Sequence, residues 1–282
     1  MRAWIASVEE VFREASARWT LVAYFALSTL FILTFALAVN LDIVDGALAG
    51  AKLFGKQVEV SGSMSIEKLV MGFESGFSGV LYVLCTFLAI FATAHLVPRM
   101  QEKGTIDLYL SRPVSRMKLI LSRYVAGLIL AASNIVYLIG SIWMIVAWKT
   151  HVFHPRFFLA GGVILFLIAV LLAFAFMIGV ITSSTAVSIM ATYGVFFFGV
   201  MLAGHARIEA ALSKEWQAMS IKTLYWIMPK TAELATSVVA FVGGRQFENE
   251  IIKVTAAPFW STAIFGFVCL TLASWLFQRK EF

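Results

Sequence analysis

The side chains best able to form ionic contacts lie together in one short segment, 99–118, between two long apolar stretches. Basic residues outnumber acidic ones there: Arg99, Lys103, Arg112, Arg116 and Lys118 against Glu102 and Asp107. Guanidinium and ammonium groups pair readily with carboxylates on the surface of another protein. In a water-exposed position, the segment predicts a docking surface for a soluble partner. The alternative is a solvated basic loop that only fixes the orientation of the chain.

The sequence contains no pattern that is typical of a catalytic or metal centre. It has no G-x-x-x-x-G-K-[ST] phosphate loop, so we do not expect this chain to hydrolyse ATP. H-E-x-x-H, C-x-x-C and an arrangement of Ser, His and Asp are also missing. His151 and His154 are three residues apart, but no third ligand accompanies them in that turn. We therefore predict that the chain is not an enzyme and holds no metal or cofactor of its own.

The overall composition indicates a polytopic membrane protein. The chain is 61% hydrophobic and 13% charged, whereas soluble domains carry about 25% charged residues. The net charge of +6 is attributed to basic loops on the inner side of the membrane, and no nucleic-acid binding is expected. Cys85 and Cys269 lie within apolar runs, as small buried residues do. We predict a single transmembrane domain over residues 1–282, with no room for a large soluble domain.

Runs without Asp, Glu, Lys or Arg mark the membrane spans, because a helix needs about 20 apolar residues to cross and a central charge costs about 2.5–3.5 kcal/mol. One run, 157–206, is too long for a single helix, and its Ser and Thr residues at 181–186 favour a turn. The sequence thus predicts an all-α polytopic protein with six transmembrane helices. We place them near 19–41, 77–97, 119–148, 157–180, 186–205 and 258–277.

The Lys and Arg residues predict the orientation of these spans. They divide evenly between the two sides, but on one side they lie close to the span ends, in 1–18, 99–123 and 278–282. This concentration of Lys and Arg near the span ends favours cytoplasmic termini and a cytoplasmic 99–118 segment in a cell (inner or plasma) membrane. Apart from Arg123 near the inner end of the third span, the predicted spans contain no acidic or basic residue, which argues against a proton-coupled transporter. The energy for any transport should therefore come from outside this polypeptide.

Four segments flank or interrupt these spans. Residues 1–18 have apolar side chains at helical spacing and predict an amphipathic helix on the inner membrane surface, or alternatively one packed along the bundle. Segment 99–118 predicts two short helices around a bend at Pro113. The outer segment 42–75 reads as a flexible loop with a short helix at 65–73. In 206–253, the 11 uncharged residues from 234 to 244 are too few to span, so an outer re-entrant or interfacial segment is expected between helices five and six.

Asn134 lies near the middle of the third predicted span. An amide in hydrocarbon needs hydrogen-bonding partners, so the side chain should face the interior of the bundle. Two interpretations stay open: a polar residue of a transport pathway, and a hydrogen bond between helices with no role toward a substrate.

Several motifs together resemble those of ABC-2 type permease subunits of ABC exporters. Glu102-Lys-Gly-Thr105 followed by Leu110-Ser-Arg-Pro-Val-Ser-Arg116 is similar to the E-x-G-T and L-x-x-P-x-x-R pattern that leads from the second span into the third in that family. The first helix ending in Arg18-Trp19, the stretch 224–234 and the tail 277–282 are similar as well. The resemblance covers nearly the whole chain.

The resemblance implies a six-span permease with a cytoplasmic coupling segment. It implies two cytosolic ABC ATPase subunits, which bind ATP and Mg²⁺, and a second permease subunit, identical or related. The residues it places at or near the ATPase contact are Glu102, Gly104, Thr105, Arg112, Pro113, Ser115 and Arg116. The 181–185 turn could form a second contact, and the 206–244 segment would line the outer end of the pathway.

Two functions remain in competition at this point. The first is the permease subunit of an ATP-driven exporter, in which closure of the ATPase dimer pushes on segment 99–118. The second is a membrane anchor or assembly module that recruits a cytosolic ATPase complex without moving a solute. A substrate that stimulates ATP hydrolysis by the complex would separate them.

Overall fold

The computed structural model of the protein describes residues 19–44, 47–53, 56–58, 66–102, 104, 115–211, 215–244 and 255–280. The predicted interfacial helix at 1–18 lies outside these ranges. So do Lys103 and residues 105–114, and with them the two short helices expected around Pro113.

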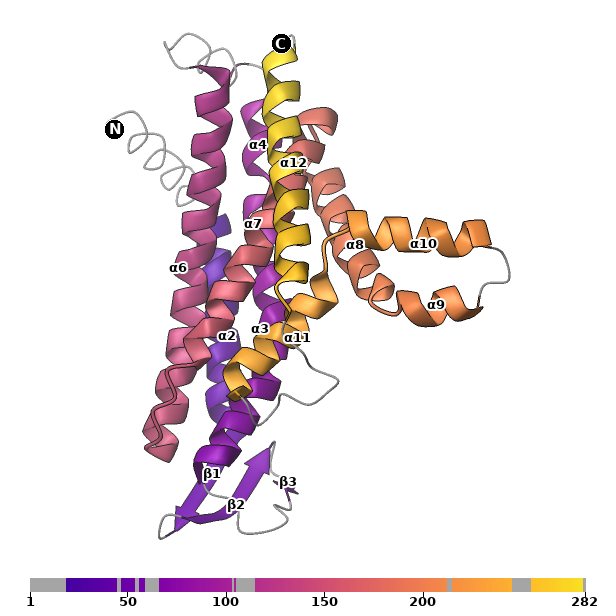
Figure 1. The fold of residues 1–282 in the computed structure, drawn as a ribbon. Coiled ribbons are helices and arrows are strands. Elements are labelled where there is room, and N and C mark those ends of the chain that lie inside the picture. The colour runs from indigo at the N-terminus through magenta and orange to yellow at the C-terminus, as the bar shows by residue number, and fades with distance from the viewer. Residues whose placement is uncertain are drawn as a thin grey trace.

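Long helices running side by side form the main body of the protein (Figure 1). They are α2 (Thr20–Ala38), α3 (Ile66–Thr93), α6 (Arg116–Thr150), α7 (Phe157–Thr182), α8 (Thr185–Leu202) and α12 (Ala257–Arg279). The short helix α4 (Leu96–Met100) follows α3. Within the described residues, five helical stretches are long and apolar enough to cross a membrane: Val70–Met100, Arg116–Thr150, Phe157–Thr182, Thr185–Leu202 and Ala257–Arg279. The apolar part of α2, Leu21–Leu37, is shorter. A polytopic helical membrane protein was therefore the correct prediction.

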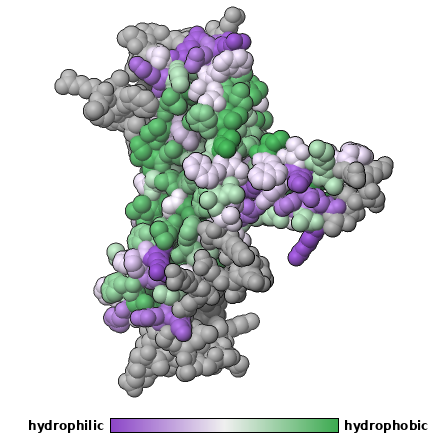
Figure 2. Space-filling view, viewed as in Figure 1, coloured by the Kyte–Doolittle hydropathy of each residue, from purple (hydrophilic) through white to green (hydrophobic). Residues whose placement is uncertain are grey.

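The helix α7 forms the centre of the bundle. It is apolar around its whole circumference and packs against α3, α6, α8 and α12. A helix of this kind is stable only where every face is covered by apolar material. The outer helices instead expose large apolar side chains, such as Leu37 at 81% and Phe267 at 70%. Figure 2 shows apolar residues along the middle of the bundle and hydrophilic residues at the end where α12 finishes.

The predicted break in the long apolar run 157–206 is confirmed. The helix α7 ends at Thr182, and Ser183 adopts a left-handed conformation with φ of 51°. Ser184 then caps α8, because its hydroxyl oxygen accepts a hydrogen bond from the Val187 amide at 3.5 Å. A side-chain oxygen that receives one of the free amides at a helix start is the usual role of serine there.

The segment between α2 and α3, expected to be a flexible loop, contains strands instead. It contains three antiparallel strands in the order β1 (Val39–Val44), β2 (Ala47–Leu53) and β3 (Lys56–Val58). Val44 pairs with Ala47, so two residues, Asp45-Gly46, separate the first two strands, which is a hairpin signal that we overlooked. The short helix expected at 65–73 is instead the beginning of α3, which continues into the span without a break. The chain is therefore not purely helical.

Three further helices follow α8: α9 (His205–Ala211), α10 (Glu215–Ile227) and α11 (Thr231–Gly243). In Figure 1, α9 and α10 lie next to each other and project sideways from the bundle. The helix α11 contains most of the 11 uncharged residues at 234–244. Gly244 ends it with φ of +63°, a conformation that glycine adopts without strain.

A buried polar contact joins α3 to the turn between α6 and α7. The Nδ1 atom of His154 lies 2.6 Å from Oε2 of Glu74, and the two side chains are 5% and 2% exposed. Among the described residues, no group of three or more His, Cys, Asp and Glu side chains could hold a metal ion. His154 therefore does not combine with His151, which is exposed, and has a structural partner that lies 80 residues away in the chain.

Replacing His154 by Ala is expected to destabilise the protein by about 3 kcal/mol, because the buried Glu74 carboxyl group then loses its partner. Unfolding in detergent micelles, followed by circular dichroism against temperature, measures the change. The control is His151→Asn in the same turn, where Asn tolerates the left-handed backbone and the side chain is exposed. Equal stability of the two variants would show that the contact contributes nothing.

Candidate functional site

Polar side chains from four parts of the chain meet at one end of the bundle. In Figure 1 this is the end that carries the C-terminus, where α4 finishes, α6 begins, α7 turns into α8 and α12 ends. The segment 99–118 connects α4 to α6 at this same end, so its two ends are held by the bundle. We refer to Gln101, Arg116, Ser183 and Lys280 as the end network.

The last turn of α7 supplies two carbonyl acceptors of the end network. The last carbonyl groups of a helix have no partner within the helix and must be satisfied from outside. The Gly179 carbonyl accepts a hydrogen bond from the Gln101 side-chain amide at 2.8 Å. The Val180 carbonyl accepts one from the Lys280 ammonium at 2.7 Å. Gln101, which follows α4, and Lys280, which follows α12, thus donate hydrogen bonds to carbonyl groups at the end of α7.

Lys280 is the centre of the end network. Besides the Val180 carbonyl, its ammonium donates to the side-chain oxygen of Gln101 at 2.7 Å and to the hydroxyl oxygen of Ser183 at 2.8 Å. Ser183 in turn donates to Gln101 at 3.2 Å. Burial lowers the pKa of Lys280. A cation at this place is also favoured by the negative end of the α7 dipole. One side chain therefore joins α12, α4 and the α7–α8 turn.

Arg116 connects the start of α6 to the same network. Its guanidinium donates hydrogen bonds to the carbonyl groups of Lys280 at 2.8 Å and Gln278 at 3.2 Å. The residue before it, Ser115, caps α6 by accepting from the Lys118 amide at 3.4 Å. The end of segment 99–118 is therefore bonded both to its own helix and to the last turn of α12.

The residues predicted at the ATPase contact do not all lie in one place in the structure. Glu102 and Gly104 are exposed just beyond α4, and Gly104 has φ of +86°. Ser115 is exposed at the start of α6, and Arg116 joins the end network. The remaining three lie outside the described residues: Thr105, Arg112 and Pro113.

Sequence reasoning named the 181–185 turn and the C-terminal tail, but it did not predict that they bond to each other. Gln101 was missed altogether. The only local signal was its position directly before Glu102. The contacts of Lys280 with Ser183 and Gln101 bridge 97 and 179 residues of sequence, and no spacing pattern reports such a separation.

Asn134 lies away from this end, in the interior of the bundle. It is fully buried on α6, and its side-chain oxygen accepts a hydrogen bond from the Ser28 hydroxyl of α2 at 2.9 Å. Its amide nitrogen has no partner among the described residues. The contact corresponds to the hydrogen bond between helices that was one of the two interpretations.

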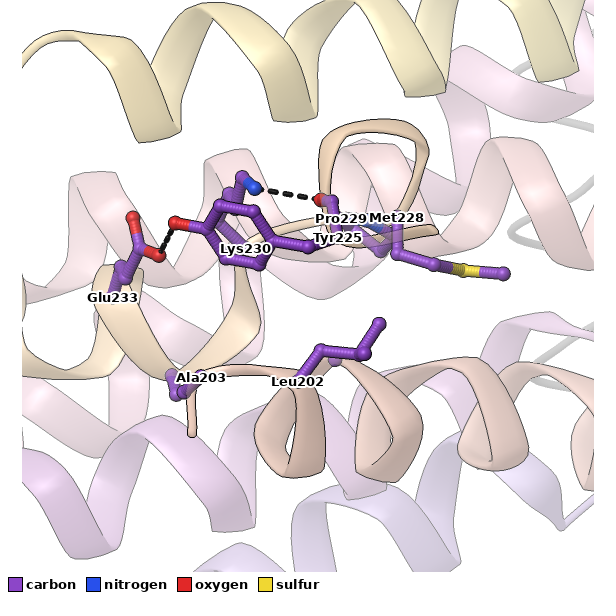
Figure 3. Close-up of a pocket in the computed structure, with 9 residues that line it drawn as sticks. Leu202, Ala203, Tyr225, Met228, Pro229, Lys230 and Glu233 are labelled. Atoms are coloured by element: carbon purple, nitrogen blue, oxygen red, sulfur yellow. Dashed lines mark hydrogen bonds between the residues drawn. The ribbon is translucent and has the colours of Figure 1, made fainter. Parts of the chain in front are cut away.

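A second polar cluster occupies the bend between α10 and α11 (Figure 3). The Lys230 ammonium donates to the Tyr225 carbonyl at 2.6 Å and lies 2.7 Å from the centre of the Tyr225 ring. The Tyr225 hydroxyl donates to the Glu233 carboxylate, and the His205 ring stacks on Tyr225. Lys230 is 5% exposed, and burial lowers its pKa to about 8, although Glu233 acts in the opposite direction.

A groove of about 510 Å³ lies beside this bend, between the end of α10 and the first half of α12. Its walls are mostly apolar and carry two indole rings. The lining residues are Trp226, Ile227, Ala257, Trp260, Ser261, Ile264, Phe265 and Val268.

Comparison of the chain with known proteins identifies its family. A sequence profile of the ABC-2 family transporter proteins matches residues 11–282. This range contains the end network, all the helices of the bundle and the bend between α10 and α11. A search among curated proteins found no match. Because the profile covers nearly the whole chain, the protein belongs to the ABC-2 family of transporter proteins.

Proposed function

We propose that this chain is the permease subunit of an ATP-binding cassette exporter, driven by separate cytosolic ATPase subunits. Membership of the ABC-2 family supports a role as the membrane component of an ABC transporter. ATP and Mg²⁺ bind to the ATPase, and this chain converts closure of the ATPase dimer into movement of its helices. Two ATPase subunits and a second permease subunit, identical or related, complete the proposed complex in the cell membrane.

The observation that carries the proposal is the attachment of segment 99–118 to the end network. A loop that only fixed orientation would need no bonds to distant helices. Here one end of the segment leads from Gln101 and the other leads into Arg116, and both residues bond to parts that also hold α7, α8 and α12. A force applied to the segment therefore reaches several spans at once, as coupling to an ATPase requires.

The proposed topology has six spans, with α2 as the first. Its 19 residues extend roughly 28 Å at 1.5 Å per residue, which nearly equals the thickness of the hydrocarbon core. The end network then faces the cytoplasm, as do both termini and residues 99–118. The helices α9, α10 and α11 form the re-entrant or interfacial segment on the outer side, between the fifth and sixth spans.

Co-expression with an ABC ATPase subunit from the same genome tests the proposal. Purification of the tagged chain in detergent is expected to recover the ATPase, and a transported substrate should stimulate ATP hydrolysis by the complex. Recovery of the chain alone would contradict the proposal. An ATPase that binds but that no exported compound stimulates would instead support the membrane anchor.

Arg116→Gln is expected to lower substrate-stimulated ATP hydrolysis by about tenfold, because two charge-assisted hydrogen bonds to the end of α12 are weakened. The rate of phosphate release by the reconstituted complex measures the effect. Lys68→Gln removes an equal charge from an exposed site near the start of α3, at the opposite end of the bundle, and should leave the rate unchanged. Equal rates for both variants would exclude a coupling role for Arg116.

A further inference from the structure

The bend between α10 and α11 combines two features that the proposed function does not use. One is the buried cation of Lys230, and the other is the apolar groove between α10 and α12. They are adjacent, because the Lys230 ammonium lies 5.2 Å from the centre of the Trp226 ring, which forms one wall of the groove.

No carboxylate of the described residues contacts the cation of Lys230 directly, although the charge of Glu233 acts on it. Glu233 accepts the hydroxyl of Tyr225 instead. Its ammonium is held by a carbonyl oxygen and an aromatic face. A buried cation whose nearby carboxylate is hydrogen-bonded to another group is only partly compensated, and an anion at the same place would offset the remaining cost. Trp226, whose ring lies beside this cation, is 59% exposed and lines the groove.

The position of the groove fits a boundary between water and hydrocarbon. The helices α9 and α10 project from the bundle and carry exposed charged residues, including Arg207 and Lys222, which do not enter the hydrocarbon core readily. The rings of Trp226 and Trp260 are largely exposed beside them, as tryptophans are at the level of lipid headgroups.

The dimensions of the groove fit a single hydrocarbon chain. It follows α12 from Ala257 to Val268, which is roughly 17 Å of helix, close to the thickness of one leaflet of the hydrocarbon core. Its volume of about 510 Å³ is also in the range of sites for small molecules.

A spanning helix from a second copy of this chain fits the site less well. Such a helix could cover the apolar walls, but the one acidic residue in the described spans is Glu74, which is already bonded to His154. It would therefore bring no further negative charge to Lys230. A phospholipid with an anionic headgroup brings both the apolar chain and the negative charge.

We propose that the groove between α10 and α12 binds one anionic phospholipid of the surrounding bilayer, with its headgroup paired to Lys230 and an acyl chain along Trp226 and Trp260. The proposal depends only on the chain being embedded in a membrane. It is independent of the exporter function and of the end network.

Quenching of tryptophan fluorescence by lipids with brominated chains tests this site in the full-length protein, reconstituted in vesicles. The part of the signal that is lost in a Trp226→Phe, Trp260→Phe double variant reports the groove. Brominated phosphatidylglycerol is expected to quench this part with about tenfold higher apparent affinity than brominated phosphatidylcholine, as one charge-assisted hydrogen bond would provide.

Variants at Lys230 distinguish specific binding in the groove from general attraction of anionic lipids to the protein. Lys230→Met should remove the preference for phosphatidylglycerol, and Lys230→Arg should retain it. Lys222→Met is the matched control, because Lys222 is exposed on α10 and the loss of its charge should leave the lipid preference unchanged. An equal loss of preference in Lys222→Met and Lys230→Met would overturn the proposal, as would equal quenching by the two lipids in the unmodified protein.

A second variant keeps the test decisive if Lys230→Met fails to fold. Ser261→Phe fills the groove, so quenching of the groove signal by both lipids should fall. Unchanged quenching in that variant would contradict the proposed site. Absence of quenching by either lipid in the unmodified protein would also overturn it and would indicate that another protein surface covers the groove.

Discussion

Lys280→Met is expected to reduce substrate-stimulated ATP hydrolysis of the assembled transporter more strongly than any other single change at the end network. The substitution removes three hydrogen bonds at once, to Gln101, the Val180 carbonyl and Ser183. Hydrogen bonds to a charged group contribute about 1.5–3 kcal/mol each, so a loss of well over tenfold in the coupled rate is expected. The end of α12 would then lose its bonds to the α7–α8 turn and to Gln101, and the turn would be linked to the residues after α4 only through the hydrogen bonds of Gln101 with Gly179 and Ser183.

The neighbouring residue supplies the control for this prediction. Arg279 is exposed, and its guanidinium lies over the Trp275 ring at 4.1 Å instead of entering the end network. Arg279→Met therefore removes a positive charge one residue away without breaking the bonds of Lys280. A coupled rate that falls equally in both variants would mean that the charge of the tail matters and the hydrogen bonds do not. The amount of ATPase that copurifies separates failed coupling from failed assembly.

Gly199→Ala is expected to destabilise the protein by about 1–3 kcal/mol or more, as overpacking of a close contact does. A Cβ atom at this position would lie 2.6 Å from the Pro229 carbonyl oxygen and 2.6 Å from Oγ1 of Thr231. Neither group can move easily. The Thr231 hydroxyl donates to the Phe196 carbonyl at 3.0 Å, and the Thr231 carbonyl accepts from Tyr82 at 2.6 Å. The contact of α8 with the start of α11 therefore requires glycine.

A second glycine of α8 provides a matched control for the change. A Cβ atom at Gly194 would have no neighbour within 4 Å. Because alanine favours a helix by about 1 kcal/mol over glycine, Gly194→Ala should be neutral or slightly stabilising. Thermal unfolding of the two variants in the same detergent measures the difference. If Gly199→Ala were as stable as Gly194→Ala, the close approach of α8 and α11 would be wrong.

The membrane-spanning helices could be predicted from the sequence because the cost of burying charge acts on each residue separately. A run without charged residues is visible without knowledge of its neighbours, and so is the break at Ser183 and Ser184, where the cap is local. The hairpin around Asp45-Gly46 carried a local signal as well. We gave it too little weight because the surrounding charges and glycines suggested a loop.

The candidate site could be predicted only in part, because its bonds join distant parts of the chain. The charge of segment 99–118 indicated a docking surface, but nothing near Gln101 or Lys280 in the sequence shows that they meet. The contact of His154 with Glu74 was not predicted for the same reason, since the pair forms only when α3 packs beside the α6–α7 turn. The burial of Lys230 likewise depends on packing by other helices and not on its own neighbours in sequence.

The most direct test of the account asks which side of the membrane carries the end network. A single cysteine replaces the exposed Glu102 in a chain whose buried Cys85 and Cys269 are changed to Ala. A membrane-impermeant maleimide is then applied to intact cells and to inside-out vesicles. We predict labelling only in inside-out vesicles, with protection when the ATPase subunit is bound. Labelling in intact cells would place the segment outside, where no cytosolic ATPase could reach it, and would contradict the proposed coupling.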